Sequence, residues 1–307
     1  MMLTSFFGKS SPINFLLLGI FIAVFCVLKV VLDHGFVLQW QEIASQIFII
    51  VLLVFSMLLL DFMVRKNYLN TSNTFAIFIF SCLVAMLPVM QHLGMVMAQF
   101  FLLMALRRIF SMTSEKNMEK KILDASLWIL LASYFYFWSI LGVIFLYIAI
   151  LKLPRKPFRY LLIPVVGLLG MFLITAALFL MKDNSFAWLS TYAKPISFNF
   201  TAYGSVEVGV FLTFFFSVLI WSVFFRISKL PDIPKKFRSN YLLVIFSVIV
   251  SVFIALFSEI KIVTELIFLA APSAIVIAGY LEKNGDVWFK EILAWTFLVL
   301  PIVFLIL

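Results

Sequence analysis

Histidine and cysteine are scarce in this sequence, so few residues are available for metal binding or for catalysis through these side chains. Each occurs twice among 307 residues, as His34 and His92 and as Cys26 and Cys82. Two histidines are too few for a multi-histidine metal centre, and the cysteines form neither a CxxC pair nor a zinc-binding spacing. Both cysteines stand inside apolar runs, where we expect them to face lipid or fill packing gaps.

Nucleotide-binding and hydrolase motifs are also absent. The sequence contains no GxxxxGK[ST], GxSxG or HExxH, which are the patterns of phosphate-binding loops, serine hydrolases and zinc peptidases. No line of charged residues recurs through the apolar runs, as a proton relay or a voltage sensor would require. The sequence therefore supports no bound nucleotide, haem or non-haem iron, and no metal site.

Charge is the third shortage. Only 12% of the residues are charged, 65% are hydrophobic, and the mean hydropathy is +1.18. No soluble domain of this length can hide so much apolar surface in one core, so the bilayer must be its solvent. The net charge of +9 then indicates basic loops at a membrane surface rather than nucleic-acid binding. We predict an all-α integral membrane protein with a single polytopic domain over residues 1–307.

The apolar runs set the number of crossings. About twenty apolar residues cross a bilayer, because each helical residue rises 1.5 Å through a core about 30 Å thick. The sequence predicts about nine transmembrane helices, at roughly 12–32, 44–64, 73–92, 95–110, 160–181, 206–225, 240–258, 263–281 and 290–307.

A further apolar run, 124–151, lies between two basic clusters. If it crosses once, nine basic residues fall outside: Lys152, Arg155, Lys156, Arg159, Arg226, Lys229, Lys235, Lys236 and Arg238. If it enters and returns, nineteen of the 23 lysines and arginines lie inside, and only Lys29, Lys182, Lys194 and Lys261 lie outside. Cytoplasmic loops carry an excess of lysine and arginine, so the second arrangement is favoured.

The run 124–151 is therefore predicted to be a re-entrant pair of half-helices, roughly 124–134 and 138–151. The turn falls at 133-SYFYFWS-139, and Asp124 suits the start of the first half-helix. The aromatic apex must be covered by protein, because lipid cannot satisfy an exposed backbone. The alternative for the run 124–151 is one long tilted helix. The topology with the re-entrant pair places the N-terminus in the cytoplasm and the C-terminus outside.

Candidate functional residues gather on the outer side in this topology. Asp33 and Glu42 share the first outer loop and are the candidate catalytic carboxylates. The candidate substrate-binding residues are Lys29, His34, Trp188, Tyr192 and Lys194. Lys29 stands four positions before Asp33 and His34 directly after it, whereas the other three belong to the longest outer loop. Ionisable groups near membrane spans are functional candidates. The alternative is that they only end helices at the interface, where Trp and Tyr are common anchors.

The stretch 120–172 resembles an uncharacterised family of polytopic bacterial inner-membrane proteins. The shared pattern is an Asp-Ala pair, an aromatic Tyr-Phe-Tyr-Phe-Trp patch, a basic turn and a Gly-Leu-Leu-Gly helix, with further likeness at 65-RKNYLNTSNTF-75 and 268-FLAAPSAIVIAGYLE-282. Such sequences are sometimes labelled beta-carotene monooxygenase. This chain contradicts that label, because that chemistry holds its iron with four histidines. The resemblance implies a multi-pass protein of the bacterial cytoplasmic membrane.

In broad topology the chain is also similar to GT-C membrane glycosyltransferases, which begin with a span followed by an outer loop with an acidic residue. That likeness implies Asp33, or else Glu42, as a base or metal ligand for transfer from a polyprenyl-phosphate sugar. No outer arginine is available to hold the donor's phosphate.

Three readings stay open at this point. The first is a GT-C-like protein handling a lipid-linked substrate at an outward-facing acidic cavity. The second is a non-enzymatic subunit of a membrane or envelope protein complex, and the third is a transporter for a small or lipophilic solute. All three have the lipid bilayer as a partner.

Overall fold

The computed structural model of the protein describes residues 2–34, 40–114, 116–153, 157–282 and 287–306. Within these ranges the chain is helical and contains no strand. Eight of the described helices are long and apolar enough to cross a membrane, which agrees with the predicted all-α, multi-pass architecture. The α-helices are α1 Leu3–Phe7, α2 Pro12–His34, α3 Trp40–Lys66, α4 Phe75–Met86, α5 Leu93–Phe110, α6 Met118–Phe135, α7 Gly142–Leu151, α8 Phe158–Asp183, α9 Trp188–Tyr192, α10 Val206–Ser228, α11 Lys235–Leu256, α12 Ile267–Leu281 and α13 Val287–Ile306.

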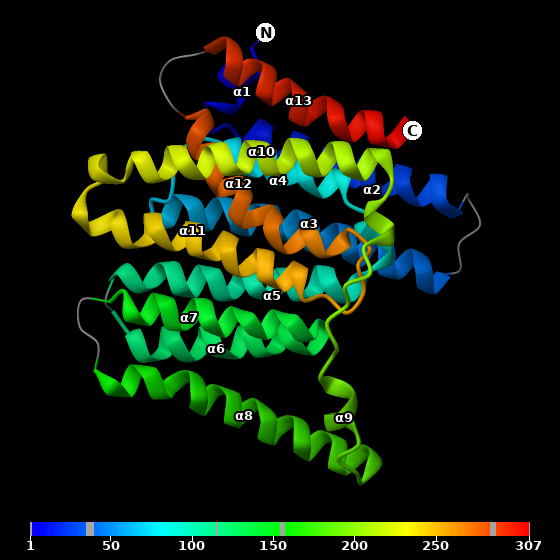
Figure 1. The fold of residues 1–307 in the computed structure, drawn as a ribbon, viewed down its shortest axis with the longest axis vertical. Coiled ribbons are helices and arrows are strands. Elements are labelled where there is room, and N and C mark those ends of the chain that lie inside the picture. The colour runs from blue at the N-terminus through cyan, green and yellow to red at the C-terminus, as the bar shows by residue number, and fades with distance from the viewer. Residues whose placement is uncertain (1, 35–39, 115, 154–156, 283–286, 307) are drawn as a thin grey trace.

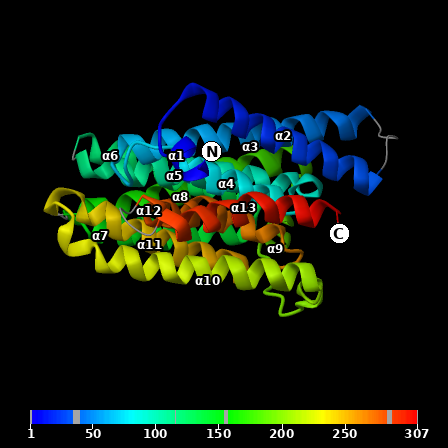
Figure 2. The ribbon, with the colours of Figure 1, turned by 90° about the horizontal axis from the view of Figure 1, so that it is seen from above.

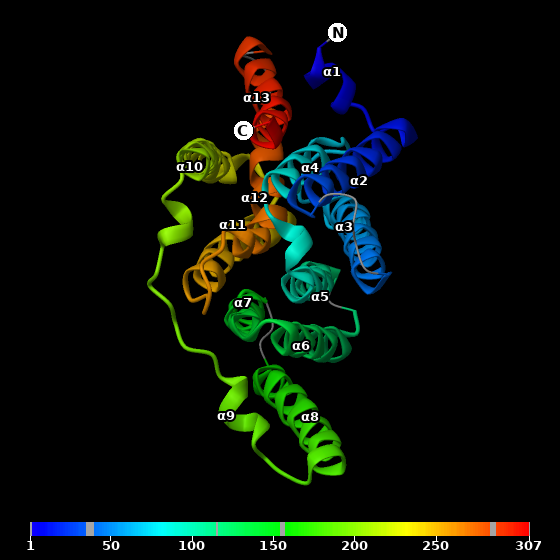
Figure 3. The ribbon, with the colours of Figure 1, turned by 90° about the vertical axis from the view of Figure 1, so that its right-hand side faces the viewer.

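The long helices run side by side and form a bundle that is drawn out in one direction (Figures 1 and 2). Figure 3 looks along the helices and shows α1 and α13 at one extreme of the bundle and α8 at the other. The α12 helix occupies the middle, and 94% of its apolar window is buried inside the protein. Its neighbours are α4, α10 and α11.

The two ends of the bundle differ in charge. The turns after α3, α5, α7 and α10 meet at one end, on the left in Figure 1, which we call the basic end. Of the nineteen cations predicted to share one side, Arg155, Lys156 and Lys283 lie outside the described residues, and the remaining sixteen lie at or near the basic end. We call the other end the opposite end.

The reversal predicted in the run 124–151 is present. The α6 helix ends at Phe135, the 3-10 helix η3 spans Phe137–Leu141, and α7 returns to the basic end beside α6. Aromatic contacts cover the apex, where Tyr136 stacks on Phe268 with ring centroids 4.9 Å apart and Trp138 meets Phe257 at 5.2 Å. These contacts pack the apex against the end of α11 and the start of α12, while Tyr134 and Phe135 beside it are exposed.

The first arm of this hairpin is longer than predicted. The α6 helix begins at Met118 after Asn117, which has a left-handed backbone with φ of 51°. Asp124 therefore does not start the helix, and its carboxylate instead pairs with Arg108 at 2.9 Å. Eighteen residues of helix reach about 27 Å, close to the thickness of a hydrocarbon core.

The helix predicted at 73–92 is shorter than expected. The α4 helix covers only Phe75–Met86, all twelve of its residues are buried, and the 3-10 helix η1 follows at Val89–Gln91. Pro88 explains the break, because the residue before a proline is pushed out of the helical region. Leu87 accordingly has an extended backbone.

Candidate functional site

The candidate residues of the first outer loop lie at the opposite end, on α2 and α3. Glu42 is exposed in the first turn of α3. Lys29 on α2 donates from Nζ to the carbonyl of Leu87 at 2.9 Å, which ties α2 to the turn after α4. The side chains of Asp33 and His34 lie outside the described part of the chain, so their predicted pairing and roles remain predictions.

The other three candidates lie elsewhere at the same end. Trp188 and Tyr192 are on α9, and Lys194 pairs with Glu259 at 3.6 Å. Figure 3 shows α9 beside α8, while α2 and α3 lie on another flank beyond α5 and α6. The structure therefore brings Trp188 and Tyr192 together and keeps them apart from Glu42 and Lys29.

Trp188 and Tyr192 line an apolar groove between α6, α8 and α9, which we call the lipid-facing groove. Its volume is about 470 Å³. Its lining comes from α6, the η3 turn, α8 and α9, and comprises Leu130, Tyr134, Ile140, Val165, Leu168, Leu169, Met171, Phe172, Thr175, Trp188, Leu189 and Tyr192. None of these residues carries a formal charge.

Aromatic contacts fix the end of this groove near α9. Trp188 stacks on Phe179 of α8 with ring centroids 5.4 Å apart. Tyr192 meets Phe137 of the hairpin apex edge to face at 5.2 Å, and its hydroxyl lies 2.7 Å from Ser133 Oγ. The α9 helix thereby links the hairpin to α8 and places a polar contact at the end of an apolar wall.

Gly167 sets the distance between α8 and α6 at the other side of the groove. A Cβ at this position would lie 2.2 Å from Ser126 Oγ and 3.1 Å from Ser126 Cβ. Gly170, one turn further along α8, would meet nothing within 4 Å. Close approach of the two helices thus depends on the first glycine of the Gly-Leu-Leu-Gly pattern and not on the second.

A buried carboxylate lies at the opposite end, at the start of α12. Glu265 is fully buried. It accepts a hydrogen bond from Tyr203 Oη at 2.7 Å and another from the backbone N–H of Ile262 at 3.1 Å. Burial, together with the Glu265 charge, raises the pKa of Tyr203.

Lys261 lies next to this carboxylate but serves the end of α11. Its Nζ donates to the carbonyls of Ala255, at 2.9 Å, and Leu256. Burial lowers the pKa of Lys261, while Glu265 acts against that shift. Val263 between them has a φ of 71°, an outlier for a β-branched residue. The arrangement caps α11 and tightens the turn into α12, which is a structural role.

A buried arginine organises the basic end. Arg226 in the last turn of α10 is 1% exposed. Its guanidinium donates to the carbonyls of Leu69 and Tyr241 and to Asn70 Oδ1, each at 3.2 Å. It also lies 3.8 Å from the centroid of the Tyr241 ring. One side chain thus joins α10, α11 and the α3–α4 turn.

Glu282 completes this network from the end of α12. Its carboxylate accepts from Thr71 N–H at 3.0 Å and from Asn73 Nδ2 at 2.7 Å. Burial raises the pKa of Glu282, and these hydrogen bonds and Arg226 act against the shift. An open cavity of about 600 Å³ borders the network and is lined by residues that include Arg65, Asn70 and Glu282.

Sequence reasoning missed this network because Arg226 was counted among the loop cations. One signal pointed to this network, because its members come from the two shorter segments of resemblance. The segment 65–75 contains Leu69 and Asn70, which accept from Arg226, and the segment 268–282 ends at Glu282, which accepts from Asn73. Nothing in their spacing showed that they meet at Arg226.

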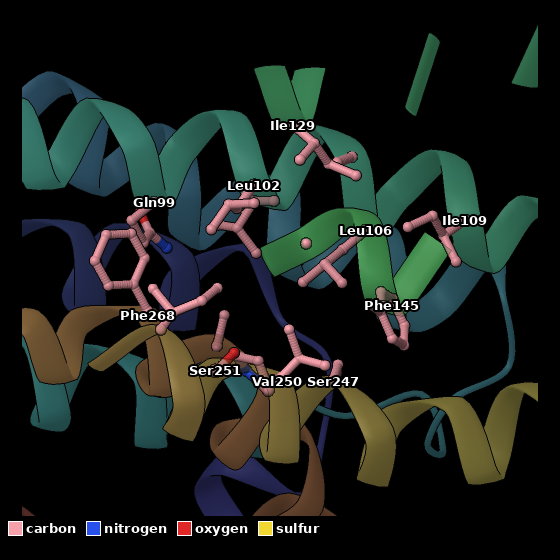
Figure 4. A pocket seen from close by; sticks show the side chains of 16 residues that line it. Gln99, Leu102, Leu106, Ile109, Ile129, Phe145, Ser247, Val250, Ser251 and Phe268 are labelled. Carbon is pink, nitrogen blue, oxygen red and sulfur yellow. The ribbon is translucent and has the colours of Figure 1, made fainter. Parts of the chain in front are cut away.

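A small cavity lies in the middle of the bundle, between α5, α6, α7, α11 and α12 (Figure 4). Its volume is about 30 Å³ and its lining is mainly apolar. Gln99 lies at one end, where its Oε1 accepts from Ser56 Oγ at 3.2 Å. A space of this volume holds one or two water molecules, so its size is that of a hydration site rather than a substrate site.

Metal chemistry has no evident centre in the part of the chain that the structure describes. No group of three or more His, Cys, Asp or Glu side chains is placed there to hold an ion. Cys26 and Cys82 are both buried and unpaired, as expected for packing residues.

These features define a multi-pass, all-helical protein with an apolar groove at one end and a cation-rich surface at the other. The chain belongs to a family of unknown function, DUF6427, whose model matches residues 2–307. This match confirms the expectation of an uncharacterised family. No curated protein and no solved structure matches the chain.

Proposed function

We propose that this protein binds the hydrocarbon part of a lipid or lipid-linked molecule in the lipid-facing groove. The observation that carries the proposal is the groove itself, about 470 Å³ of space lined without a formal charge. Ligand sites typically enclose about 300–1,000 Å³. Apolar walls with nothing against them forfeit dispersion contacts, so in a bilayer hydrocarbon is the natural occupant.

The charge distribution supports an orientation with the basic end in the cytoplasm. Cytoplasmic loops are rich in lysine and arginine, and sixteen described cations lie at or near the basic end. The groove ends at α9, on the opposite end. In this orientation a lipid enters from the outer leaflet of the bacterial inner membrane, and its polar head lies near Tyr192 and Ser133.

This orientation is testable with single cysteines in a chain from which Cys26 and Cys82 have been removed. Asn117→Cys and Pro157→Cys both stand at the basic end, before and after the hairpin. We expect both to resist a membrane-impermeant thiol reagent in intact cells. Ser190→Cys on α9, which is exposed at the opposite end, should react and serves as the positive control.

Labelling at position 157 with protection at position 117 would contradict a hairpin whose two ends share one side. Labelling at both, with position 190 protected, would reverse the orientation and place the groove towards the cytoplasm.

The groove favours lipid handling over the other readings, without a catalytic step. Glu42 is on α3, which lies on another flank of the bundle (Figure 3). Lys194 and Lys261 are engaged by Glu259 and by the end of α11. A GT-C-like transfer would need an acid and a cation near the bound lipid. We therefore propose lipid binding as the function, either as the binding part of a transfer system or as an accessory subunit that presents lipid.

A tryptophan placed in the groove tests the proposal directly. Leu168→Trp adds bulk at a lining position of α8, whereas Leu173→Trp adds the same bulk at an exposed position that does not line the groove. With a photoreactive isoprenoid phosphate or phospholipid, we expect Leu168→Trp to reduce apparent affinity about tenfold, which corresponds to about 1.4 kcal/mol. Leu173→Trp should bind like the wild type.

The labelled peptides locate the site independently of affinity. The proposal predicts crosslinks on α6, α8 and α9 that are lost in Leu168→Trp. Equal labelling of wild type and both variants, spread over all lipid-facing helices, would mean that only bulk lipid contacts the protein. Comparison of the two probes identifies the lipid class.

A further inference from the structure

A second cavity lies at the basic end, between the ends of α5 and α7 and the start of α11. Its volume is about 270 Å³. Its lining combines three lysines with hydroxyl, amide and apolar groups, and comprises Ile109, Met112, Thr113, Ala149, Lys152, Leu153, Lys235, Lys236, Ser239, Asn240 and Leu243. We call it the lysine pocket. It shares no lining residue with the lipid-facing groove.

The lysine pocket carries charge of one sign. Lys152 follows α7, and Lys235 and Lys236 open the first turn of α11. No aspartate or glutamate lines the pocket, and none of the ion pairs among the described residues uses these lysines. The first turn of α11 adds backbone N–H groups and the positive end of a helix dipole, which favour an anion.

The neighbouring cavity beside Arg226 differs in this respect. It contains Arg65, but Glu282 also lines it, and Asp61 pairs with Arg65 at 2.8 Å. Carboxylates therefore offset the cation there. Of these two basic-end cavities, the lysine pocket is the one whose formal charges are all positive.

The walls of the lysine pocket are held in place by hydrogen bonds. Asn240 is 3% exposed. Its Nδ2 donates to the carbonyl of Phe110 at 3.0 Å and to Thr113 Oγ1 at 2.7 Å. These bonds fix α11 against the turn after α5, so the pocket between them is preformed. The Nζ of Lys152 lies 5.3 Å from the centroid of the Phe246 ring, and that of Lys236 lies 5.6 Å from the Phe237 ring.

The pocket also has an apolar side. Ile109, Ala149 and Leu243 belong to α5, α7 and α11 and lie further into the bundle than the lysines at the helix ends. A ligand that suits both parts has a phosphate with hydrocarbon attached. Basic pockets between membrane helices on the cytoplasmic side are suited to anionic lipid head groups.

We infer that the lysine pocket binds the phosphate of an anionic phospholipid from the leaflet at the basic end. Each lysine contributes a point charge, and the apolar wall receives the start of an acyl chain. The inference does not depend on the lipid-facing groove, which lies at the opposite end and is uncharged.

The test uses the full-length protein, purified in mild detergent and stripped of lipid. Binding of phosphatidylglycerol is compared with that of phosphatidylcholine by native mass spectrometry and by the shift in melting temperature. The pocket variant is Lys152→Gln/Lys235→Gln/Lys236→Gln. The control variant, Lys9→Gln/Lys116→Gln/Lys120→Gln, removes the same charge from exposed positions of the same end that do not line the pocket.

We expect the pocket variant to bind phosphatidylglycerol at least tenfold more weakly than the wild type, and the control variant to stay within about twofold. Without lipid, both variants should melt like the wild type, because the substituted lysines are exposed. Equal losses in both variants would show that overall charge, and not the pocket, holds the lipid. If neither variant loses affinity for phosphatidylglycerol, the lysine pocket is not its binding site.

Inorganic phosphate and glycerol phosphate separate the two sources of a phosphate group. The inference requires that neither displaces phosphatidylglycerol at concentrations below about a hundredfold excess. If either anion displaces phosphatidylglycerol at equal concentration, and the pocket variant no longer binds that anion, the pocket is a site for a soluble anion and the lipid assignment is overturned.

Discussion

Replacing Arg226 with methionine is expected to lower the free energy of unfolding by about 3–5 kcal/mol, because each buried acceptor left without a donor costs about 1–3 kcal/mol. Methionine keeps much of the side-chain volume. It leaves the carbonyls of Leu69 and Tyr241 and the Asn70 side chain without the donors they have now. Unfolding in a denaturing detergent, followed by circular dichroism, measures the loss.

Arg238→Met is the matched control for this change. Arg238 lies at the same end and donates to the carbonyls of Ile233 and Pro231 in its own turn, but it is partly exposed. Surface changes of this kind shift stability by about 0.5 kcal/mol or less, and we expect at most twice that here. Equal losses in the two variants would show that Arg226 does not hold the helices together. Arg226→Lys keeps the charge without the planar guanidinium, so its free energy of unfolding should lie between those of Arg226→Met and the wild type.

Gly167→Leu is expected to push α8 away from α6 and to alter the lipid-facing groove. Even a Cβ would lie 2.2 Å from Ser126 Oγ, and overpacking of this kind costs about 1–3 kcal/mol. Because α6 and α8 form two of the groove's walls, photolabelling of the groove should fall along with stability. Gly170→Leu, which meets open space, should change neither.

A compensating pair tests the geometry behind this expectation. Gly167→Ala forces Ser126 Oγ to move from a site where it donates to the carbonyl of Leu123 at 2.7 Å. Ser126→Gly removes the obstacle, so the double variant should be more stable than Gly167→Ala alone. If Gly167→Leu and Gly170→Leu behave alike, α8 is not held to α6 at this position.

The reversal of the chain between α6 and α7 was the most predictable part of the fold. The reversal within 124–151 followed from counting cations across the whole chain, and the structure turns at Tyr136 inside the predicted segment. The predicted start of helix α6 at Asp124 was wrong, because an aspartate at this position has two plausible roles. A carboxylate can favour a helix N-terminus or pair with a cation, and only the position of Arg108 on α5 decides between them.

The polar networks were the least predictable part. Arg226 meets residues 156 and 157 positions away in the chain, and no periodic pattern encodes such a meeting. The bond between Glu265 and Tyr203 spans 62 positions and is equally invisible in the sequence. The predicted role of Trp188 and Tyr192 in substrate binding stays a prediction, although their common helix α9 places both in one groove.

The position of α12 has a consequence for how the chain is made. This helix is the most enclosed of the candidate spans, and α4, its neighbour, is buried along its whole length. Yet α4 leaves the ribosome well before α12. Until α12 follows, α4 lacks the neighbour that later encloses it, and it must be sheltered by lipid or by the insertion machinery. The enclosed helix α12 is thus inserted only after its neighbours α4, α10 and α11 have been made.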